Sequence, residues 1–128
     1  MPHLTIEYSR NLDDKMSMDG FCKSMLEAAL ATGLFEIGAV RVRAHACDNY
    51  AISDGHPDNA FLDMSLRIGM GRDLSAKKQA GDAIFEAACD HLSKLFETPH
   101  FALSFEIREI DKELSWRKNA IHPRLRGQ

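Results

Sequence analysis

The sequence carries one short motif twice, first as Arg10-Asn-Leu-Asp-Asp-Lys15 and again, 62 residues later, as Arg72-Asp-Leu-Ser-Ala-Lys77. An alternating apolar run precedes each copy, over residues 3–8 and residues 60–69, and a helical pattern follows each copy. Similarity at a fixed spacing indicates a repeated structural unit. The motif therefore predicts two copies of one strand-to-helix junction.

From the first copy, the chain continues into a predicted helix and a second strand. An apolar stripe that includes Phe21 and Met25 predicts a helix over residues 13–32, and Gly33 is placed to end it. Residues 39–46 then alternate between apolar and polar side chains. This alternation is typical of a strand with one buried face.

The second copy leads through the same order of elements. Asp73 is the predicted N-cap of a helix, and Thr98-Pro99 is predicted to end it. Residues 101–107 alternate as a fourth strand. The tail, residues 113–128, has weak periodicity, and we predict a short strand or an arm that packs on a neighbouring subunit.

Two strand-helix-strand units predict an α+β fold, a two-layer arrangement of a four-stranded sheet with two helices on one face. A crossover helix makes its flanking strands parallel, and the right-handed crossover places both helices on the same side. We expect one domain over residues 1–128, with internal units of about 1–57 and 58–128. The opposite face is expected to carry apolar residues that another subunit covers, which predicts a homo-oligomer.

Composition excludes several classes of function. The net charge of −3 at pH 7 argues against a nucleic-acid surface, and no run approaches the length of a membrane span. The N-terminus does not resemble a signal peptide. Three separated cysteines without a CxxC pair predict buried free thiols in a reducing cytoplasm. The six histidines show no HxH or HExxH spacing, so we predict no metal site.

Pro2, in the opening stretch MPHLTIEYS, has two interpretations. Strands tolerate proline at a first position, where its missing N–H costs little. Alternatively, removal of Met1 would leave Pro2 with a secondary amine at the chain end, a group that no other residue type supplies. A retained Met1 would instead make that nitrogen a tertiary amide without basicity. Pro2 taken alone does not decide between them.

Together these features resemble the tautomerase superfamily, whose members are built from β-α-β units and begin with a catalytic proline. GRDLSAKKQAG resembles the arginine-containing stretch of 4-oxalocrotonate tautomerase. The sequence is more similar still to the 5-carboxymethyl-2-hydroxymuconate isomerases, which fuse two units in one chain. That similarity runs from MPHLTIEYS through ATGLFEIGAVRVR, FLDMSLRIGMGR and QAGDAIFEA to ALSFEIREI. It implies a homotrimer around a barrel of sheets. Arg10 and the C-terminal HPRLRGQ depart from the family pattern.

The resemblance implies an isomerase that converts a muconate-type dienol into its conjugated ketone without a cofactor. In the family this step belongs to homoprotocatechuate and 4-hydroxyphenylacetate breakdown. Pro2 would transfer the proton, Arg41 matches the family's catalytic arginine, and Arg72 matches the substrate-binding arginine. Arg43 shares a strand face with Arg41 and is a further binding candidate, while Arg67 is a weaker one. From alternation alone, these arginines are solvated surface residues.

The chemistry is consistent with these residue types. An α-amino group titrates near 8, and both burial and neighbouring arginines lower its pKa, so a free base is present near neutral pH. A substrate with several carboxylates needs a local positive cluster on a chain of net negative charge. An arginine can hold a carboxylate through two hydrogen bonds and stabilise charge on an adjacent oxygen.

Two further expectations concern the number of sites and the surface. Sliding one unit onto the other by 62 residues puts Met64 where Pro2 stands, so we expect one site per chain and three per trimer. Trp116 is predicted to anchor an interface, and His45 to be a polar residue of a strand face. Three alternatives remain at this point: another tautomerase substrate, dehalogenase chemistry with the same proline, or a trimeric binding module without catalysis.

Overall fold

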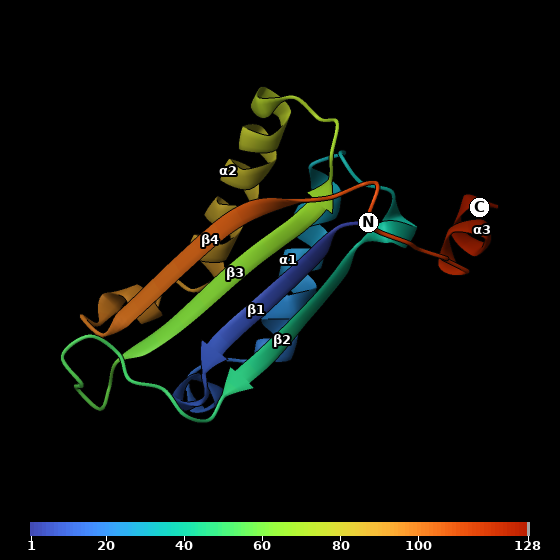
Figure 1. The fold of residues 1–128 in the computed structure, drawn as a ribbon. Coiled ribbons are helices and arrows are strands. Elements are labelled where there is room, and N and C mark those ends of the chain that lie inside the picture. The colour runs from blue at the N-terminus through green and yellow to red at the C-terminus, as the bar shows by residue number, and fades with distance from the viewer. Residues whose placement is uncertain (128) are drawn as a thin grey trace.

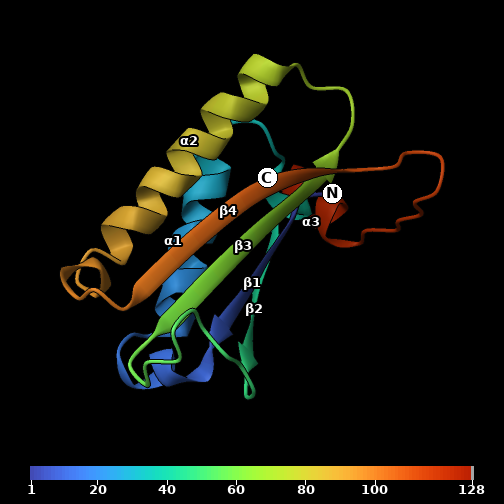
Figure 2. The ribbon, with the colours of Figure 1, turned by 60° about the vertical axis from the view of Figure 1, so that its left-hand side comes forward.

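The computed structural model describes residues 1–127 and has two layers, a sheet and a pair of helices that cover one of its faces (Figures 1 and 2). The sheet has four strands. In chain order the main elements are β1 (His3–Ser9), α1 (Met18–Ala31), β2 (Arg41–Cys47), β3 (Ala60–Gly69), α2 (Leu74–His91) and β4 (Phe101–Ile110). The predicted α+β fold is therefore confirmed.

The strand order is β2-β1-β3-β4, so the first strand of each unit lies at the centre of the sheet. β1 pairs with β2, and β3 with β4, in parallel, whereas β1 and β3 are antiparallel. Leu4 of β1 faces Leu66 of β3 in this central pairing. Because these two leucines are also 62 residues apart, an approximate two-fold axis relates the unit β1-α1-β2 to the unit β3-α2-β4.

Side-chain alternation places the core between the sheet and the helices. Every second residue of the two central strands points towards α1 and α2, as expected for a strand with one buried face. The strand residues that are fully buried there are Leu4, Ile6, Leu62, Met64, Leu66 and Ile68, and the helices contribute Phe21, Met25, Ala29, Ile84 and Ala88.

The other face of the sheet corrects one of our expectations, because it is mainly polar. Side chains such as Thr5, Arg43 and Ser104 occupy it, and Phe61 and Ala102 are apolar exceptions. Alternation has placed the apolar residues of the strands on the helix-covered face. Our argument for a homo-oligomer assumed that the open face is apolar and must be covered by a second subunit, and this assumption was wrong.

The repeated motif adopts two different structures. Its first copy forms a 3₁₀ turn, η1 (Arg10–Asp14), so α1 begins later than predicted, after the N-cap Ser17. Contacts within the turn stabilise it: the Tyr8 hydroxyl donates to Asp13 Oδ1 at 2.8 Å, and Arg10 pairs with Asp13 at 3.2 Å. The second copy starts α2, where the predicted N-cap Asp73 accepts from the Ala76 amide at 2.8 Å.

The end of α2 and the burial of the cysteines also differ in detail from the prediction. α2 ends at His91, before a 3₁₀ turn, η3 (Leu95–Glu97), and so does not reach Thr98-Pro99. Cys22, Cys47 and Cys89 are free, as predicted, but half-buried. Within residues 1–127, no helix combines the length and the apolar character that crossing a membrane requires.

The tail contains no strand within residues 113–127, which corrects that part of the prediction. It ends in α3 (Ile121–Arg126), which packs against the 3₁₀ turn η2 (Ile37–Ala39) of the same chain. Asn119 Nδ2 donates to the Gly38 carbonyl at 2.8 Å, and Arg126 holds both oxygens of Glu36. The extended stretch before α3 leaves Trp116 86% exposed. Gln128 lies outside the described residues.

Candidate active site

The start of the chain lies at one end of the sheet, between β2 and β3 (Figure 1). Pro2 is buried, and its carbonyl accepts a hydrogen bond from the Arg41 amide at 3.2 Å. His3, the first residue of β1, is in register with Arg41 on one side and with Arg67 on the other. The central position of β1 therefore places an arginine on each side of the chain start.

The Arg41 side chain is fixed against the first residue of the chain. It is half-buried, and its Nη1 contacts Met1 Sδ at 2.9 Å and donates to the Ala39 carbonyl at 3.2 Å. A guanidinium held by a backbone carbonyl loses little further freedom when it binds an anion. Arg41 is thus pre-positioned at the N-terminus.

Arg72 reaches the same region from the junction between β3 and α2. Gly71, with φ +114°, makes the turn that precedes it, a backbone conformation that favours glycine. The Arg72 guanidinium donates to the carbonyls of Gly69 and Leu34, both at 3.2 Å, and lies 5.1 Å from the centre of the Phe35 ring. These contacts hold its charge in a fixed, half-buried position.

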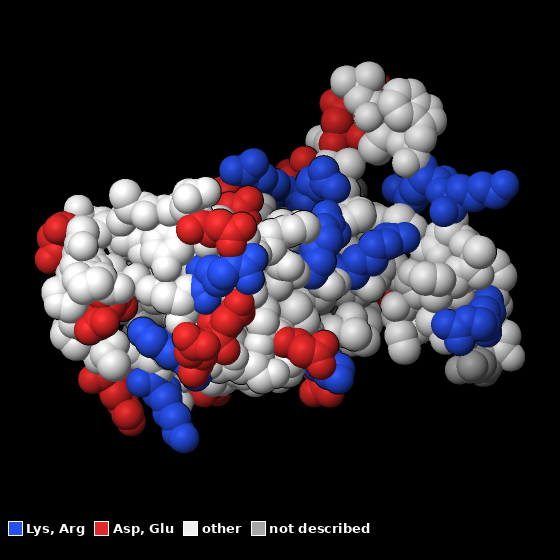
Figure 3. All heavy atoms as spheres, turned by 90° about the horizontal axis from the view of Figure 1, so that it is seen from below, with Lys and Arg blue, Asp and Glu red and all other residues white. Residues whose placement is uncertain are grey.

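Positive charge surrounds the N-terminus although the chain as a whole is negative. Burial lowers the pKa of the Met1 amino group, and the charges of Arg117, Arg72, Arg41 and Arg67 lower this pKa further. Figure 3 shows Lys and Arg side chains gathered towards the side of the molecule that carries α3. An amine here favours its neutral form, while an anion would be attracted.

Only some of the arginines predicted from the sequence affect the N-terminal amine. The charges of Arg41, Arg72 and the weaker candidate Arg67 lower the pKa of the Met1 amine, and the Arg41 amide also donates to the Pro2 carbonyl. Arg43 lies two residues further along β2, where its Nη1 contacts His3 Nδ1 at 3.2 Å. Together with burial and Arg67, it lowers the pKa of His3.

Arg117 was missed by the sequence analysis. It lies in the extended stretch before α3, where neither periodicity nor a motif indicated a position in space. Its positive charge, in a tail that also carries Lys118, was the only available signal. The anchoring of α3 on η2 brings this stretch close enough for Arg117 to act on the N-terminal amine.

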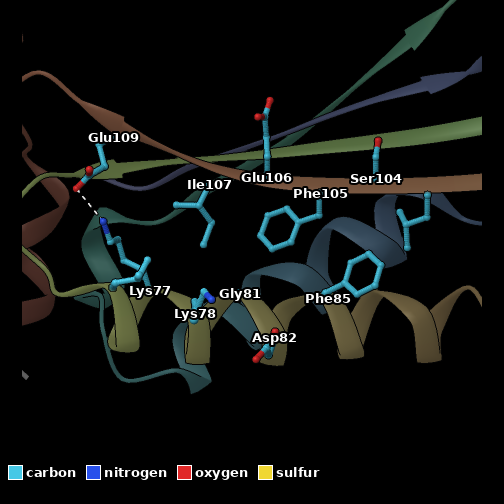
Figure 4. A pocket seen from close by; sticks show the side chains of 12 residues that line it. Lys77, Lys78, Gly81, Asp82, Phe85, Ser104, Phe105, Glu106, Ile107 and Glu109 are labelled. Atoms are coloured by element: carbon cyan, nitrogen blue, oxygen red, sulfur yellow. Dashed lines mark ion pairs between the residues drawn. The ribbon is translucent and has the colours of Figure 1, made fainter.

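A groove on the surface lies away from the N-terminus. It has a volume of about 680 Å³ and lies between α2 and β4, with Phe85, Phe105 and Ile107 along it and the ion pair of Lys77 and Glu109, at 3.4 Å, at one end (Figure 4). None of the four arginines around the N-terminus lines it. We therefore assign the candidate active site to the N-terminus and not to this groove.

The comparisons with known proteins agree on one family. Residues 2–125 match the family described as 5-carboxymethyl-2-hydroxymuconate isomerase. The chain is 36% identical over 122 residues to the 5-carboxymethyl-2-hydroxymuconate Delta-isomerase of Escherichia coli, covering 95% of this chain and 97% of that protein.

Solved structures give the same result. The crystal structure of a 5-carboxymethyl-2-hydroxymuconate isomerase from Deinococcus radiodurans R1 is 36% identical, with a TM-score of 0.90 over 97% of this chain and 93% of that one. A structure described as a fused 4-OT symmetric trimer shares the fold, at 12% identity and a TM-score of 0.62 over 91% of this chain and 93% of that one. The chain belongs to the 5-carboxymethyl-2-hydroxymuconate isomerase family.

Proposed function

We propose that this protein isomerises 5-carboxymethyl-2-hydroxymuconate, converting the dienol into its conjugated ketone during homoprotocatechuate and 4-hydroxyphenylacetate breakdown. Family membership and the 36% identity to the Escherichia coli enzyme support this substrate. The observation that carries the proposal is the positive charge at the start of β1: Arg41 contacts Met1, Arg67 is in register with His3, and the charges of Arg72 and Arg117 also lower the pKa of the Met1 amine. Such a cluster suits a substrate with several carboxylates.

In the proposed reaction, the Pro2 nitrogen acts first as a base and then as an acid, once Met1 has been removed. The nitrogen takes the proton of the 2-hydroxyl group, and the oxygen electron pair forms the C2 carbonyl. The C2–C3 double-bond electrons move to form the C3–C4 double bond. The π electrons of the C4–C5 double bond then form a C–H bond at C5 with the proton that the nitrogen holds. One proton leaves oxygen and one arrives at carbon, so no oxidant or cofactor enters the balance.

The arginines have complementary roles in this proposal. Arg41 binds the carboxylate next to the reacting hydroxyl and stabilises negative charge as it develops on the 2-oxygen. Arg72, at the start of α2, binds a second carboxylate, and Arg117 and Arg67 add attraction for the remaining charge. Arg43 is a secondary binding candidate because it lies beside His3, further along the sheet.

The proposal includes a cytoplasmic homotrimer with one site per chain. Within residues 1–127, the outer edges of β2 and β4 have no paired strand, and the groove of Figure 4 runs beside the second edge. Leu114 and Trp116 are 72% and 86% exposed, which supports the prediction of an interface anchor. Exposed strand edges and apolar side chains favour contact with another copy. The three free cysteines are consistent with a reducing compartment.

Two measurements test the proposal. The intact mass of the purified protein should lack one methionine, and the dienol absorbance should decay faster with the protein than without it. Equal decay in both samples would exclude this activity. Conversion of a different muconate-type substrate, or of a haloacrylate, in its place would assign one of the alternative tautomerase activities. Sedimentation at equilibrium tests the trimer separately.

A further inference from the structure

Three potential metal ligands meet where the two strands of the second unit begin. β3 and β4 are parallel, so the residues that precede them lie at the same edge of the sheet. The Ala60 amide donates to the His100 carbonyl at 2.8 Å and joins the two segments. This pairing brings His56 and Asp58, which precede β3, next to His100, which precedes β4.

The three side chains are close enough to share one ion. One ligand atom from each of His56, Asp58 and His100 lies within 4.8 Å of those of the other two. The two imidazole rings are stacked, with centroids 4.2 Å apart and an interplanar angle of 22°. Stacked rings do not direct their in-plane lone pairs at one point, so the exposed His56 ring must turn out of the stack before both imidazoles can bind one ion at about 2.0–2.2 Å.

A hydrogen-bond network leaves His100 in a form that can bind a metal. Asn59 Nδ2 donates to the Ile52 carbonyl at 3.1 Å and to Asp54 Oδ1 at 2.8 Å, which fixes the orientation of the amide. Asn59 Oδ1 therefore faces His100 Nδ1, at 3.1 Å, and can only accept. The imidazole proton must lie on Nδ1, so Nε2 of neutral His100 keeps its lone pair.

The loop holds His56 in a hydrogen bond that an ion would replace. His56 Nδ1 accepts from the Asp58 amide at 3.1 Å, so its lone pair is engaged there, and an ion must displace this amide before Nδ1 can bind it. The Asp54 carboxylate accepts from the His56 amide at 3.2 Å. Asn59 donates to Asp54 Oδ1 at 2.8 Å, so the same amide that faces His100 also holds the loop that carries His56.

We propose that His56, Asp58 and His100 bind one Zn²⁺ ion, with water in the remaining position. Two imidazoles and one carboxylate suit zinc, whereas Mg²⁺ and Ca²⁺ prefer oxygen ligands alone. The ion ties the segment between the two units to the start of β4. The seven steps along β3 from Ala60 to Arg67 span about 23 Å. This distance separates the site from the N-terminus, so the site is independent of the proposed isomerase activity.

The test uses the full chain, freed of metals with a chelator and titrated with ZnCl₂ by calorimetry. We expect one Zn²⁺ per chain, and binding at least about tenfold weaker in His56→Ala and in His100→Gln. His45→Ala, which removes an exposed histidine of β2, is the matched control and should bind as the unchanged chain does. MgCl₂ should neither bind nor compete.

A second readout separates ligand loss from misfolding. Co²⁺ in place of Zn²⁺ should give the visible absorption bands of a four-coordinate site. Zn²⁺ should raise the Tm of the unchanged chain and of His45→Ala, but not of the ligand variants. Equal Zn²⁺ binding by His45→Ala and His56→Ala, or no Zn²⁺ binding at millimolar concentration, would overturn the proposal. Dienol turnover should be the same with and without Zn²⁺, so neither result bears on the isomerase assignment.

Discussion

The two β-α-β units share a backbone plan but differ at their equivalent first positions. In the first unit, Pro2 stands at the start of the chain, buried but with only Met1 before it. In the second unit, the equivalent residue is Met64, in the middle of β3 and fully buried. The same position in the fold thus presents a potential free amine in one unit and a core side chain in the other.

The neighbouring strands differ in the same way. In the first unit His3 is in register with Arg41, and in the second unit its equivalent, Ser65, is in register with Glu106. Glu106 pairs with Arg108 at 2.8 Å on the open face. Where the first unit has a cation to hold a carboxylate, the second unit therefore has an anion that would repel one.

The second unit nevertheless contributes to the site of the first. Arg67 lies on β3, Arg72 at the start of α2 and Arg117 after β4, and all three act on the chain start, whereas Arg41 is the only such charge from the first unit. The comparison teaches that a duplicated fold need not duplicate a site. The first unit supplies the chain start, and the second supplies three of the four arginines whose charges act on it.

The strongest test of this difference is to block the Pro2 nitrogen with a peptide bond, as the nitrogen of the equivalent residue Met64 is blocked. An alanine inserted between Met1 and Pro2 turns the proline nitrogen into a tertiary amide. We expect dienol isomerisation to fall by as much as about 10⁴-fold, the upper range for loss of one acid–base group. Circular dichroism and Tm should be nearly unchanged, because Met1 already occupies that position. Full activity in this variant would exclude Pro2 as the base.

The second prediction replaces the charged residue at the equivalent position of each unit by alanine. Arg41→Ala should lower kcat/KM by about 10²–10³-fold, as for loss of one donor that stabilises a developing oxyanion. Glu106→Ala is the matched control from the second unit and should leave kcat/KM within about twofold, since its partner Arg108 is solvated. Comparable losses in both variants, measured by initial rates, would mean that the units do not differ in chemistry.

The third prediction compares the equivalent first positions by stability. Met64→Ala should lower the free energy of unfolding by about 2–5 kcal/mol, because it leaves a cavity between β3 and the helices. Pro2→Ala should change it by about 1 kcal/mol or less, mainly through chain entropy, while keeping weak activity from a primary amine. Urea unfolding of both variants measures the difference, and a larger loss for Pro2→Ala would contradict it.

The smallest expected effect concerns the charge that the second unit lends. After burial, the Arg117 guanidinium is the largest cause that lowers the pKa of the Met1 amine. We expect it to act in the same way on the Pro2 amine that removal of Met1 exposes, so Arg117→Ala should raise the pKa of that amine. The active form is the free base, which is lost as the pH falls through the pKa. The acid limb of the kcat/KM profile should therefore move to higher pH, whereas Arg117→Lys should keep it in place. An unmoved limb in Arg117→Ala would remove this role.

The sequence was sufficient for most of the fold because alternation and helical stripes are local patterns. The strand over residues 60–69 and the N-cap of α2 at Asp73 were predicted correctly for this reason. The first helix was predicted to start at residue 13, where the observed start is Met18. Side-chain contacts of Arg10 with Asp13 and with the distant Asp48 stabilise a 3₁₀ turn there, and motif similarity did not reveal them.

The site was predictable only where a residue belongs to a regular element. Arg41 and Arg72 lie on a strand and at a helix start, so their neighbourhood followed from the β-α-β order. Arg117 follows β4 in an irregular stretch, whose path depends on the anchoring of α3 at Gly38 and Glu36. The histidine cluster also depends on tertiary structure, because its residues precede two different strands and show no metal-binding spacing.

The burial of Pro2 has a consequence for how the protein is made. An aminopeptidase must reach the Met1–Pro2 bond, and in the folded chain Pro2 is buried and Arg41 contacts the Met1 side chain. β1 leaves the ribosome first, and at about 5–20 residues per second its partner β3 follows roughly 3 to 12 s later. We expect methionine excision to be fastest in that interval. A cell that synthesises the chain faster than it trims nascent ends should accumulate folded molecules that keep Met1, and peptidase added after purification should remove this residue more slowly than from the nascent chain.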